Sequence, residues 1–306
     1  MILCITPNPA WDVTYRLPAL IPDAVHHVCD VAERAGGKGV NVASVARGAG
    51  HDVLVCAPVG GARRAEFMHD LTSRGLSTAL INSPLPTRQS VAVVTPHGVT
   101  MLNEQGVPQP DAVWLDLIST VEREAGRCRV VTVSGSLPPQ TPADLLARIT
   151  RAAHQGGARV VLDCRGPHLL KALREGPELV KPNAEEAQAT TGESDPVRAA
   201  RALVAAGARA ALVTLGAEGV VVVDDRGTAL RARLDSPVSG NPTGAGDAMT
   251  AAVAVALERT EHPDWRATLR DGVSWSAAAV LADVAGEVDH ATVADLIPHV
   301  LLEEIR

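Results

Sequence analysis

Helical patterns and short apolar runs alternate through the second half of the chain. Three helix-like segments are each followed by an apolar run: 111–125 by 129–133, 142–155 by 159–162, and 196–206 by 210–213. Such alternation is typical of parallel strands joined by right-handed crossovers, with helices on both faces of the sheet. The pattern therefore predicts an α/β fold with a mostly parallel sheet.

The first hundred residues have a different pattern. Ile2–Ile5 reads as a short buried strand that stops at Pro7, and 52–57 as a second strand, with helices at about 39–49 and 63–74. Alternating stretches, typical of exposed hairpins, occur at 12–31 and at 89–102. We predict that segments of about 12–32 and 88–103 form a small β lid on a single domain spanning residues 1–306.

A glycine-led helix start precedes the apolar run 248–257. Gly244, Ala245 and Gly246 open this helix, and their backbone N–H groups would form a cradle for phosphate oxygens. Asp247 follows directly. A carboxylate there would repel phosphate, which favours a base directed at a hydroxyl-bearing reactant. From the residues alone, a carboxylate that only complements the helix dipole is the alternative.

A second glycine-led helix start contains Gly37, Lys38 and Asn41. It differs from the Walker phosphate loop, because the lysine lies between glycines and Asn41 stands where that loop has a hydroxyl residue. Two such starts predict two facing sites, one for each substrate. The alternative is two ordinary helix starts.

Polar residues follow the predicted strands, where ligands of parallel sheets bind. The strand-end segments are 134–138, Asp163, 181–186 and 214–219.

Composition limits the function classes. Aromatic residues make up 2% of the chain and the net charge is −7, which argues against nucleic-acid or anionic-membrane binding. Five widely spaced cysteines, no basic leader and no apolar run near 18 residues lead us to expect a reduced, cytoplasmic protein outside the membrane.

With these segments together, the chain resembles the PfkB (ribokinase-like) family of carbohydrate kinases, in its 1-phosphofructokinase and tagatose-6-phosphate kinase branch. The resemblance extends over nearly the whole chain and rests on motifs in the family's order: Asn8-Pro9-Ala10-x-Asp12, 36–43, Thr87-Arg88, Asn103-Glu104, 134–139, Lys181-Pro182-Asn183-x-x-Glu186, 215–219 and 244–247.

The resemblance implies a three-layer αβα sandwich with a β lid that forms a homodimer. It also implies transfer of the ATP γ-phosphate to a sugar hydroxyl with Mg²⁺. Asp247 would be the general base, with Gly244, Ala245 and Gly246 holding the transferring phosphoryl group. This agrees with phosphoryl transfer, which depends on positioning and charge neutralisation.

For the acceptor, the resemblance implies Asp12 at the sugar hydroxyls and a further set at the sugar and its phosphate: Gly37, Lys38, Asn41, Arg88 and Ser136. For the nucleotide it implies Lys181, Asn183, Glu186, Thr214, Gly216 and Gly219, with Glu186 reaching Mg²⁺ through water. Lys38 and Arg88 suit a phosphorylated sugar.

Fructose 1-phosphate is the expected acceptor, with tagatose 6-phosphate or fructose 6-phosphate as alternatives. A kinase for an unphosphorylated sugar or nucleoside, and a silent phosphosugar sensor, are further alternatives. One departure from the branch pattern is Val25-His26-His27. If these residues lie on a lid strand, at most one histidine can face the sugar, and we favour His27.

Overall fold

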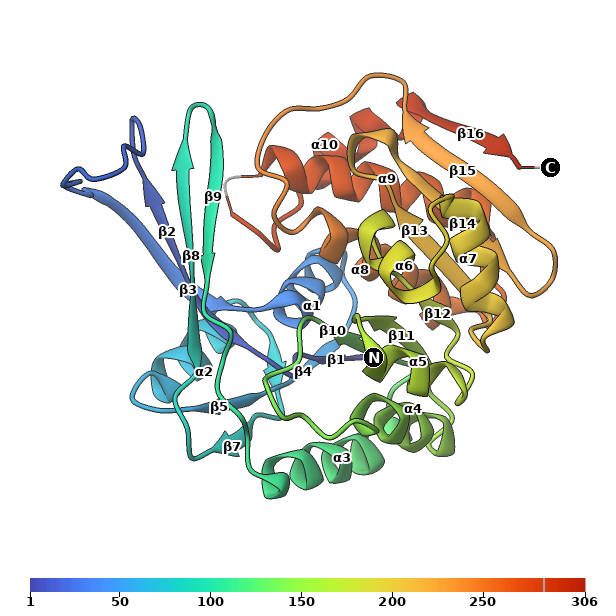
Figure 1. The fold of residues 1–306 in the computed structure, drawn as a ribbon, viewed down its shortest axis with the longest axis horizontal. Coiled ribbons are helices and arrows are strands. Elements are labelled where there is room, and N and C mark those ends of the chain that lie inside the picture. The colour runs from blue at the N-terminus through green and yellow to red at the C-terminus, as the bar shows by residue number, and fades with distance from the viewer. Residues whose placement is uncertain (283, 306) are drawn as a thin grey trace.

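The computed structural model describes residues 1–282 and 284–305. Within them, a ten-stranded sheet runs through the body of the molecule (Figure 1). Its strands, in spatial order, are β16 (Val300–Glu304), β15 (Ala229–Leu234), β14 (Val220–Asp224), β13 (Ala210–Thr214), β12 (Leu179–Val180), β11 (Arg159–Asp163), β10 (Val130–Ser134), β1 (Ile2–Ile5), β4 (Val53–Cys56) and β6 (Ser77–Thr78).

The sheet is parallel from β13 to β6 and antiparallel from β13 to β16. Alternate residues of β1 enter two separate cores: Ile2 and Cys4 pack on one face, and Leu3 and Ile5 on the other. Because both faces of the sheet are covered, its strands read as continuous apolar runs.

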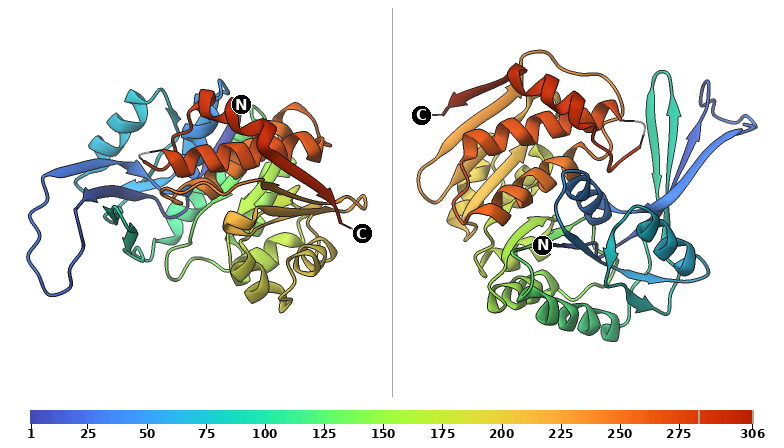
Figure 2. Two further views of the ribbon diagram at one scale, coloured as in Figure 1. Left: turned by 90° about the horizontal axis from the view of Figure 1, so that it is seen from above. Right: turned by 180° about the vertical axis from the view of Figure 1, so that it is seen from behind.

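Helices form the two outer layers (Figures 1 and 2). One core includes residues of α1 (Lys38–Gly48), α2 (Arg64–Ser73), α8 (Ala245–Arg259), α9 (Trp265–Leu281) and α10 (His290–Leu296). The other includes residues of α3 (Asp111–Ala125), α4 (Leu145–Gln155), α5 (Pro167–Leu173), α6 (Ala184–Thr191) and α7 (Pro196–Ala205). Two short 3₁₀ helices among the described residues are η1 (Gly216–Glu218) and η2 (Ile297–His299).

Local sequence explains several of these boundaries. Helix α7 begins where the Asp195 side chain accepts the N–H of Arg198 and Pro196 takes the first turn. Helix α6 begins with a capping box between Asn183 and Glu186. The structure confirms the helices and strands predicted for the second half of the chain. One boundary differs, since α4 begins at Leu145 rather than at 142.

A second sheet of four strands stands away from the body (Figure 1). We call it the lid: β3 (Asp30–Gly36), β2 (Ala10–Arg16), β8 (Arg88–Thr95) and β9 (Gly98–Asn103), in that order. A two-stranded sheet, β5 (Pro58–Gly60) with β7 (Ile81–Ser83), completes the strands of the described residues.

The first lid hairpin differs from the prediction. Strand β2 begins at Ala10 and β3 continues to Gly36, while residues 17–29 form a loop without strand structure. Pro18 and Pro22 lie in this loop, where the lost N–H donors prevent ladder pairing. Strand β3 leads directly into α1 and places the glycine-led helix start at Gly37 beneath the lid.

The three-layer αβα architecture predicted for the chain is confirmed. None of the helices in the described part of the chain is long and apolar enough to cross a membrane.

Candidate active site

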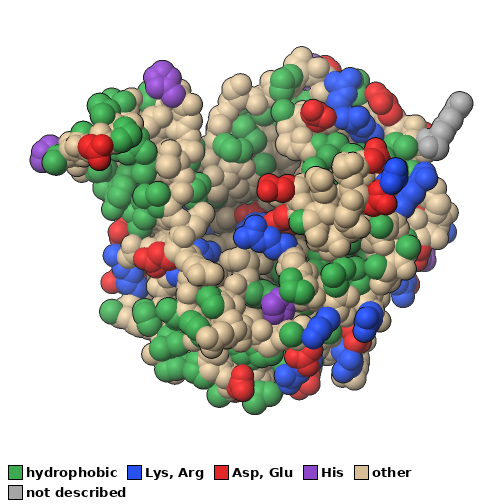
Figure 3. Space-filling view, viewed as in Figure 1, with side chains coloured by type: hydrophobic (Ala, Val, Ile, Leu, Met, Phe, Trp, Pro, Cys, Tyr) green, Lys and Arg blue, Asp and Glu red, His purple; other side chains and the backbone are tan. Residues whose placement is uncertain are grey.

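A cavity of about 740 Å³ lies between the lid and the carboxyl ends of the parallel strands. Figure 3 shows the hollow, with acidic and basic side chains at its floor. It is lined by lid residues (Asp12, Arg88, Ser90, Met101), by the start of α1 (Gly37, Lys38, Asn41), by strand-end loops (Ser136, Asp163, Arg165, Glu186) and by the start of α8 (Gly244, Gly246, Asp247). Ten of the sixteen residues predicted for the site therefore share this cavity.

The start of α8 is the place where the sequence predicts an anion cradle. Gly244 caps the helix with a φ of 91°, in the left-handed region that favours glycine. A Cβ on Gly244 would also lie 3.1–3.2 Å from Ala285 and Gly286. Ala245 donates its N–H to the Pro242 carbonyl at 3.3 Å, so its donor is already engaged in a turn. The first-turn N–H groups of Gly246 and Asp247 have no intrahelical partner, and both residues line the cavity.

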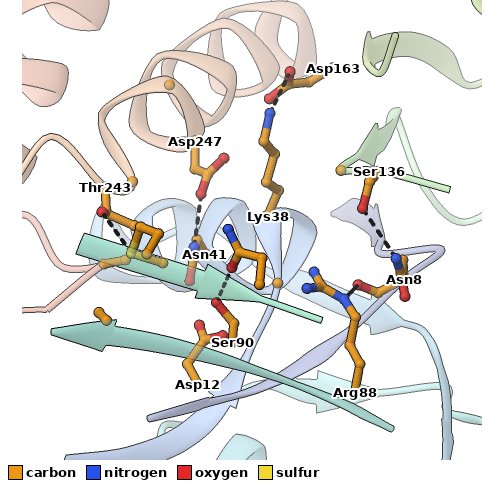
Figure 4. A pocket seen from close by; sticks show the side chains of 18 of the residues that line it. Asn8, Asp12, Lys38, Asn41, Arg88, Ser90, Ser136, Asp163, Thr243 and Asp247 are labelled. Carbon is orange, nitrogen blue, oxygen red and sulfur yellow. Dashed lines mark hydrogen bonds and ion pairs between the residues drawn. The ribbon is translucent and has the colours of Figure 1, made fainter. Parts of the chain in front are cut away.

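Asp247 is buried, with 4% of its surface exposed. Its Oδ2 accepts a hydrogen bond of 2.8 Å from Nδ2 of Asn41 (Figure 4). Burial raises the pKa of Asp247 to about 6, against the nearby positive charge of Lys38. The carboxylate is consequently ionised at neutral pH, yet is more basic than an ordinary aspartate.

Asp163 contacts one lysine from the predicted acceptor set and one from the predicted nucleotide set. The sequence did not predict this role. It ends β11 and is 2% exposed, with Oδ1 3.4 Å from Lys38 Nζ and Oδ2 3.2 Å from Lys181 Nζ. Burial alone would raise the pKa of Asp163, but Lys181 and Lys38 hold it below its ordinary value. Its position at the end of an apolar strand was the only sequence signal, and the two lysine partners lie far away in the chain.

Part of the cavity wall is formed where the lid meets α1. Arg88 donates to the backbone carbonyls of Asn8 (3.3 Å) and Glu104 (3.0 Å), and Asn8 donates to Ser136 Oγ at 3.2 Å. Burial raises the pKa of Asp12 to about 6, although Arg88 and neighbouring donors oppose this. All six predicted acceptor residues line the cavity.

Lid residue Arg34 was not predicted to contribute. It pairs in register with Asp12 across β2 and β3, lines the cavity, and forms an ion pair of 3.1 Å with Glu287. This contact connects the lid with the segment after α9, across the cavity.

The predicted nucleotide residues other than Glu186 lie outside the cavity. Lys181 and Asn183 follow β12 and Thr214 ends β13, with Asn183 and Thr214 paired as an isolated bridge. Gly216 and Gly219 flank η1, and Gly219 packs against the Ala232 carbonyl, where a Cβ would lie only 2.0 Å away. Gly219 therefore has a structural reason to be glycine, independent of any nucleotide.

The expectation for the histidine pair is wrong in this chain. His26 and His27 lie in the loop between β2 and β3, not on a strand, and neither lines the cavity. His26 Nε2 instead contacts the backbone of Ile21.

Comparison with known proteins explains this constellation. Residues 3–289 match the pfkB family carbohydrate kinase. The chain belongs to this family. A carbohydrate kinase of the pfkB family is a phosphotransferase that acts on a hydroxyl group and takes ATP as co-substrate.

Curated relatives and a solved structure agree with the assignment. The chain is 38% identical to the 1-phosphofructokinase of Rhodobacter capsulatus, over 82% of this chain and 81% of that protein. It is 32% identical to the 1-phosphofructokinase of Xanthomonas campestris pv. campestris, over 91% and 97%. Phosphofructokinase-2 from Escherichia coli in complex with fructose-6-phosphate is similar, with a TM-score of 0.85, 26% identity, and coverage of 97% and 98%.

Proposed function

We propose that this pfkB-family kinase transfers the γ-phosphoryl group of ATP to fructose 1-phosphate, giving fructose 1,6-bisphosphate. The observation that carries the proposal is Asp247, a buried carboxylate with a raised pKa beside the glycine cradle. The names of the curated relatives support the choice of acceptor.

In the proposed reaction, the acceptor hydroxyl gives its proton to Asp247 as its oxygen bonds to the γ-phosphorus. The bond from that phosphorus to the bridging oxygen breaks, and ADP leaves. The N–H groups of Gly244 and Gly246 would face the developing negative charge, and Lys38 adds positive charge nearby. The N–H of Ala245, which the resemblance also assigns to this role, is already bonded to the Pro242 carbonyl. A base with a pKa of about 6 is well matched to this step at neutral pH.

The acceptor is positioned by the lid side of the cavity. Asp12 and Gly37 would contact the sugar hydroxyls, and Lys38, Arg88 and Ser136 the sugar's phosphate. Lys38 and Arg88 favour a phosphorylated sugar over a neutral one, because the phosphate would form charge-assisted contacts with both.

The nucleotide would lie along the sheet edge formed by Lys181, Asn183, Thr214, Gly216 and Gly219. Glu186 would hold a magnesium ion through water: it lines the cavity, and its Oε2 accepts the Asn183 N–H at 3.1 Å, which orients the carboxylate. Such an oxygen donor suits Mg²⁺ held through water. When bound, the ion would neutralise phosphate charge.

We also propose that two copies associate through their lids. Large apolar side chains of the lid and its loop are exposed, including Ile21 (57%), Val25 (85%) and Leu102 (58%). Exposed apolar groups on the lid and its loop favour a partner surface. Light scattering of the native protein and of a Val25→Asp, Leu102→Asp double variant tests this, since a native monomer would contradict it. Cytoplasmic location is a further proposal, supported by five free cysteines.

A coupled assay of ADP release tests the function. Purified protein is supplied with ATP, Mg²⁺ and one acceptor at a time: fructose 1-phosphate, fructose 6-phosphate, tagatose 6-phosphate or free fructose. We expect the highest kcat/KM with fructose 1-phosphate. A clear preference for tagatose 6-phosphate would replace the acceptor, and binding of phosphosugar without turnover would identify a silent sensor.

A further inference from the structure

Asn41 lies at the contact between the starts of α1 and α8. It is 5% exposed, and its Nδ2 donates to Oδ2 of Asp247 at 2.8 Å (Figure 4). The family resemblance places Asn41 at the sugar, but this hydrogen bond places its amide on the proposed base.

The surroundings determine which way the Asn41 amide faces. An ionised carboxylate only accepts hydrogen bonds, so the amide nitrogen must face Asp247. The amide oxygen, Oδ1, is then buried without a hydrogen-bond partner among the described residues. Gly286 packs directly against it, since a Cβ there would lie 2.9 Å from Oδ1.

An unpaired buried oxygen is unfavourable, and a leucine of similar size would avoid it. The amide therefore contributes something that offsets this cost. The contact on its other side, with Asp247, is its one hydrogen bond between side chains in the described part of the chain.

We propose that Asn41 is a positioning residue for the base: it holds Oδ2 of Asp247, so that Oδ1 receives the proton of the acceptor hydroxyl. The proposal rests on the proposed kinase function. It gives Asn41 a role that contact with the sugar alone would not produce.

The ionisation of Asp247 is a sensitive readout. The charged groups that act on it are Lys38 from α1, Asp163 from β11 and Lys181 after β12. Burial raises the pKa of Asp247, whereas Lys38, Lys181 and the Asn41 N–H lower it. Loss of the N–H should therefore raise this pKa further, and a second carboxylate at position 41 should raise it most.

The experiment compares Asn41→Leu with Asn41→Asp, which are both close to asparagine in size. Ser44→Ala, one turn along α1, is the matched control. The carboxyl ¹³C resonance of Asp247 is titrated without substrates, and is assigned by its absence in Asp247→Asn. We expect the pKa to rise by about 1–2 in Asn41→Leu, the equivalent of one charge-assisted hydrogen bond, and further in Asn41→Asp.

Kinetics give the second readout. For Asn41→Leu we expect kcat to fall at least tenfold at pH 7, with the KM for fructose 1-phosphate changed less than threefold. The acid limb of the pH profile of kcat should move to higher pH by the same amount as the NMR titration of Asp247. Ser44→Ala should change neither.

An unchanged Asp247 titration in Asn41→Leu, with a raised KM alone, would overturn the proposal and leave Asn41 as a sugar ligand. If Asn41→Leu does not fold, Asn41→Ser and Asn41→Asp still have to raise the pKa of Asp247. The titration of Asp247 requires no turnover, so it tests the role of Asn41 even if the protein is inactive as a kinase. The proposed kinase mechanism has a separate test, because near-normal activity of Asp247→Asn would refute it.

Discussion

Replacing the proposed base should make the protein more stable while it inactivates the enzyme. Burial raises the pKa of Asp247 from 3.8 to about 6. At 1.36 kcal/mol per pH unit, this corresponds to about 3 kcal/mol of destabilisation by the buried charge at pH 7. The asparagine introduced by Asp247→Asn would resemble the neutral acid and still accept the Asn41 N–H. The variant should therefore gain on the order of 3 kcal/mol in its free energy of unfolding.

The sign of the pH dependence follows from the raised pKa. The folded state binds the proton more tightly than the unfolded state, so the cost of the charge is absent below about pH 4 and complete above about pH 6. For 306 residues, the unfolding entropy is about 0.6 kcal/mol per kelvin. The melting temperature should thus rise by about 5 °C at pH 7. The advantage should disappear near pH 4.

Thermal and urea unfolding from pH 4 to pH 8 measure this difference, and coupled assays measure kcat. We expect kcat to fall by about 10²–10⁴, the usual contribution of a general base, with nucleotide affinity nearly unchanged. Lower stability of Asp247→Asn at pH 7, or a gain independent of pH, would refute the reasoning about burial.

Asp163→Asn is the matched control, because it removes a carboxylate of similar burial in the same cavity. Lys181 and Lys38 keep the pKa of Asp163 low despite burial, so its charge stabilises the fold above the unfolded pKa. The variant leaves two lysines without their carboxylate and should lose about 3 kcal/mol or more at pH 7. This loss should shrink as the pH falls. The changes in the free energy of unfolding at pH 7 must therefore have opposite signs in Asp247→Asn and Asp163→Asn.

Three further predictions concern the walls of the cavity. Arg88→Ala should raise the KM for fructose 1-phosphate by about 10–100-fold and the KM for free fructose far less, because it removes a charge-assisted contact to the phosphate. Steady-state kinetics with both acceptors check this, and an equal rise in both KM values would indicate a disturbed lid. Gly244→Ala should lower both kcat and melting temperature, whereas Gly50→Ala, with a similar φ of 85° and open space around it, should lower stability alone. Reversing the Arg34–Glu287 pair in a double charge-swap variant should restore more of the native KM than either single swap, measured at low and high salt; no recovery would mean that the pair does not hold the lid.

The sequence by itself determined the elements and the type of chemistry. Helical periodicity and apolar runs are local properties, so the segment 111–125 could be placed from its own residues. Glycines before an apolar run likewise marked the start of α8, and Asp247 stood out there because a carboxylate is unexpected at an anion site. The motifs, taken in their order along the chain, were sufficient to identify the family, and the family predicts the fold.

Local patterns did not determine which alternating segments would pair as β-strands. The loop 17–29 has the alternation of a hairpin but not its structure, because two prolines remove donors and no partner strand lies beside it.

Only the tertiary structure decided which side chains act on one another. Asn41 and Asp247 are 206 residues apart, and Lys38 and Asp163 are 125 apart. Their contacts depend on how α1 and α8 pack on the same face of the sheet, and on where β11 ends relative to both. Packing brings these groups out of water, and burial then shifts the pKa of Asp247 upward and makes the ionised state of Asp163 dependent on two lysines. No local window of sequence contains that information, because desolvation and charge pairing are properties of the assembled cavity.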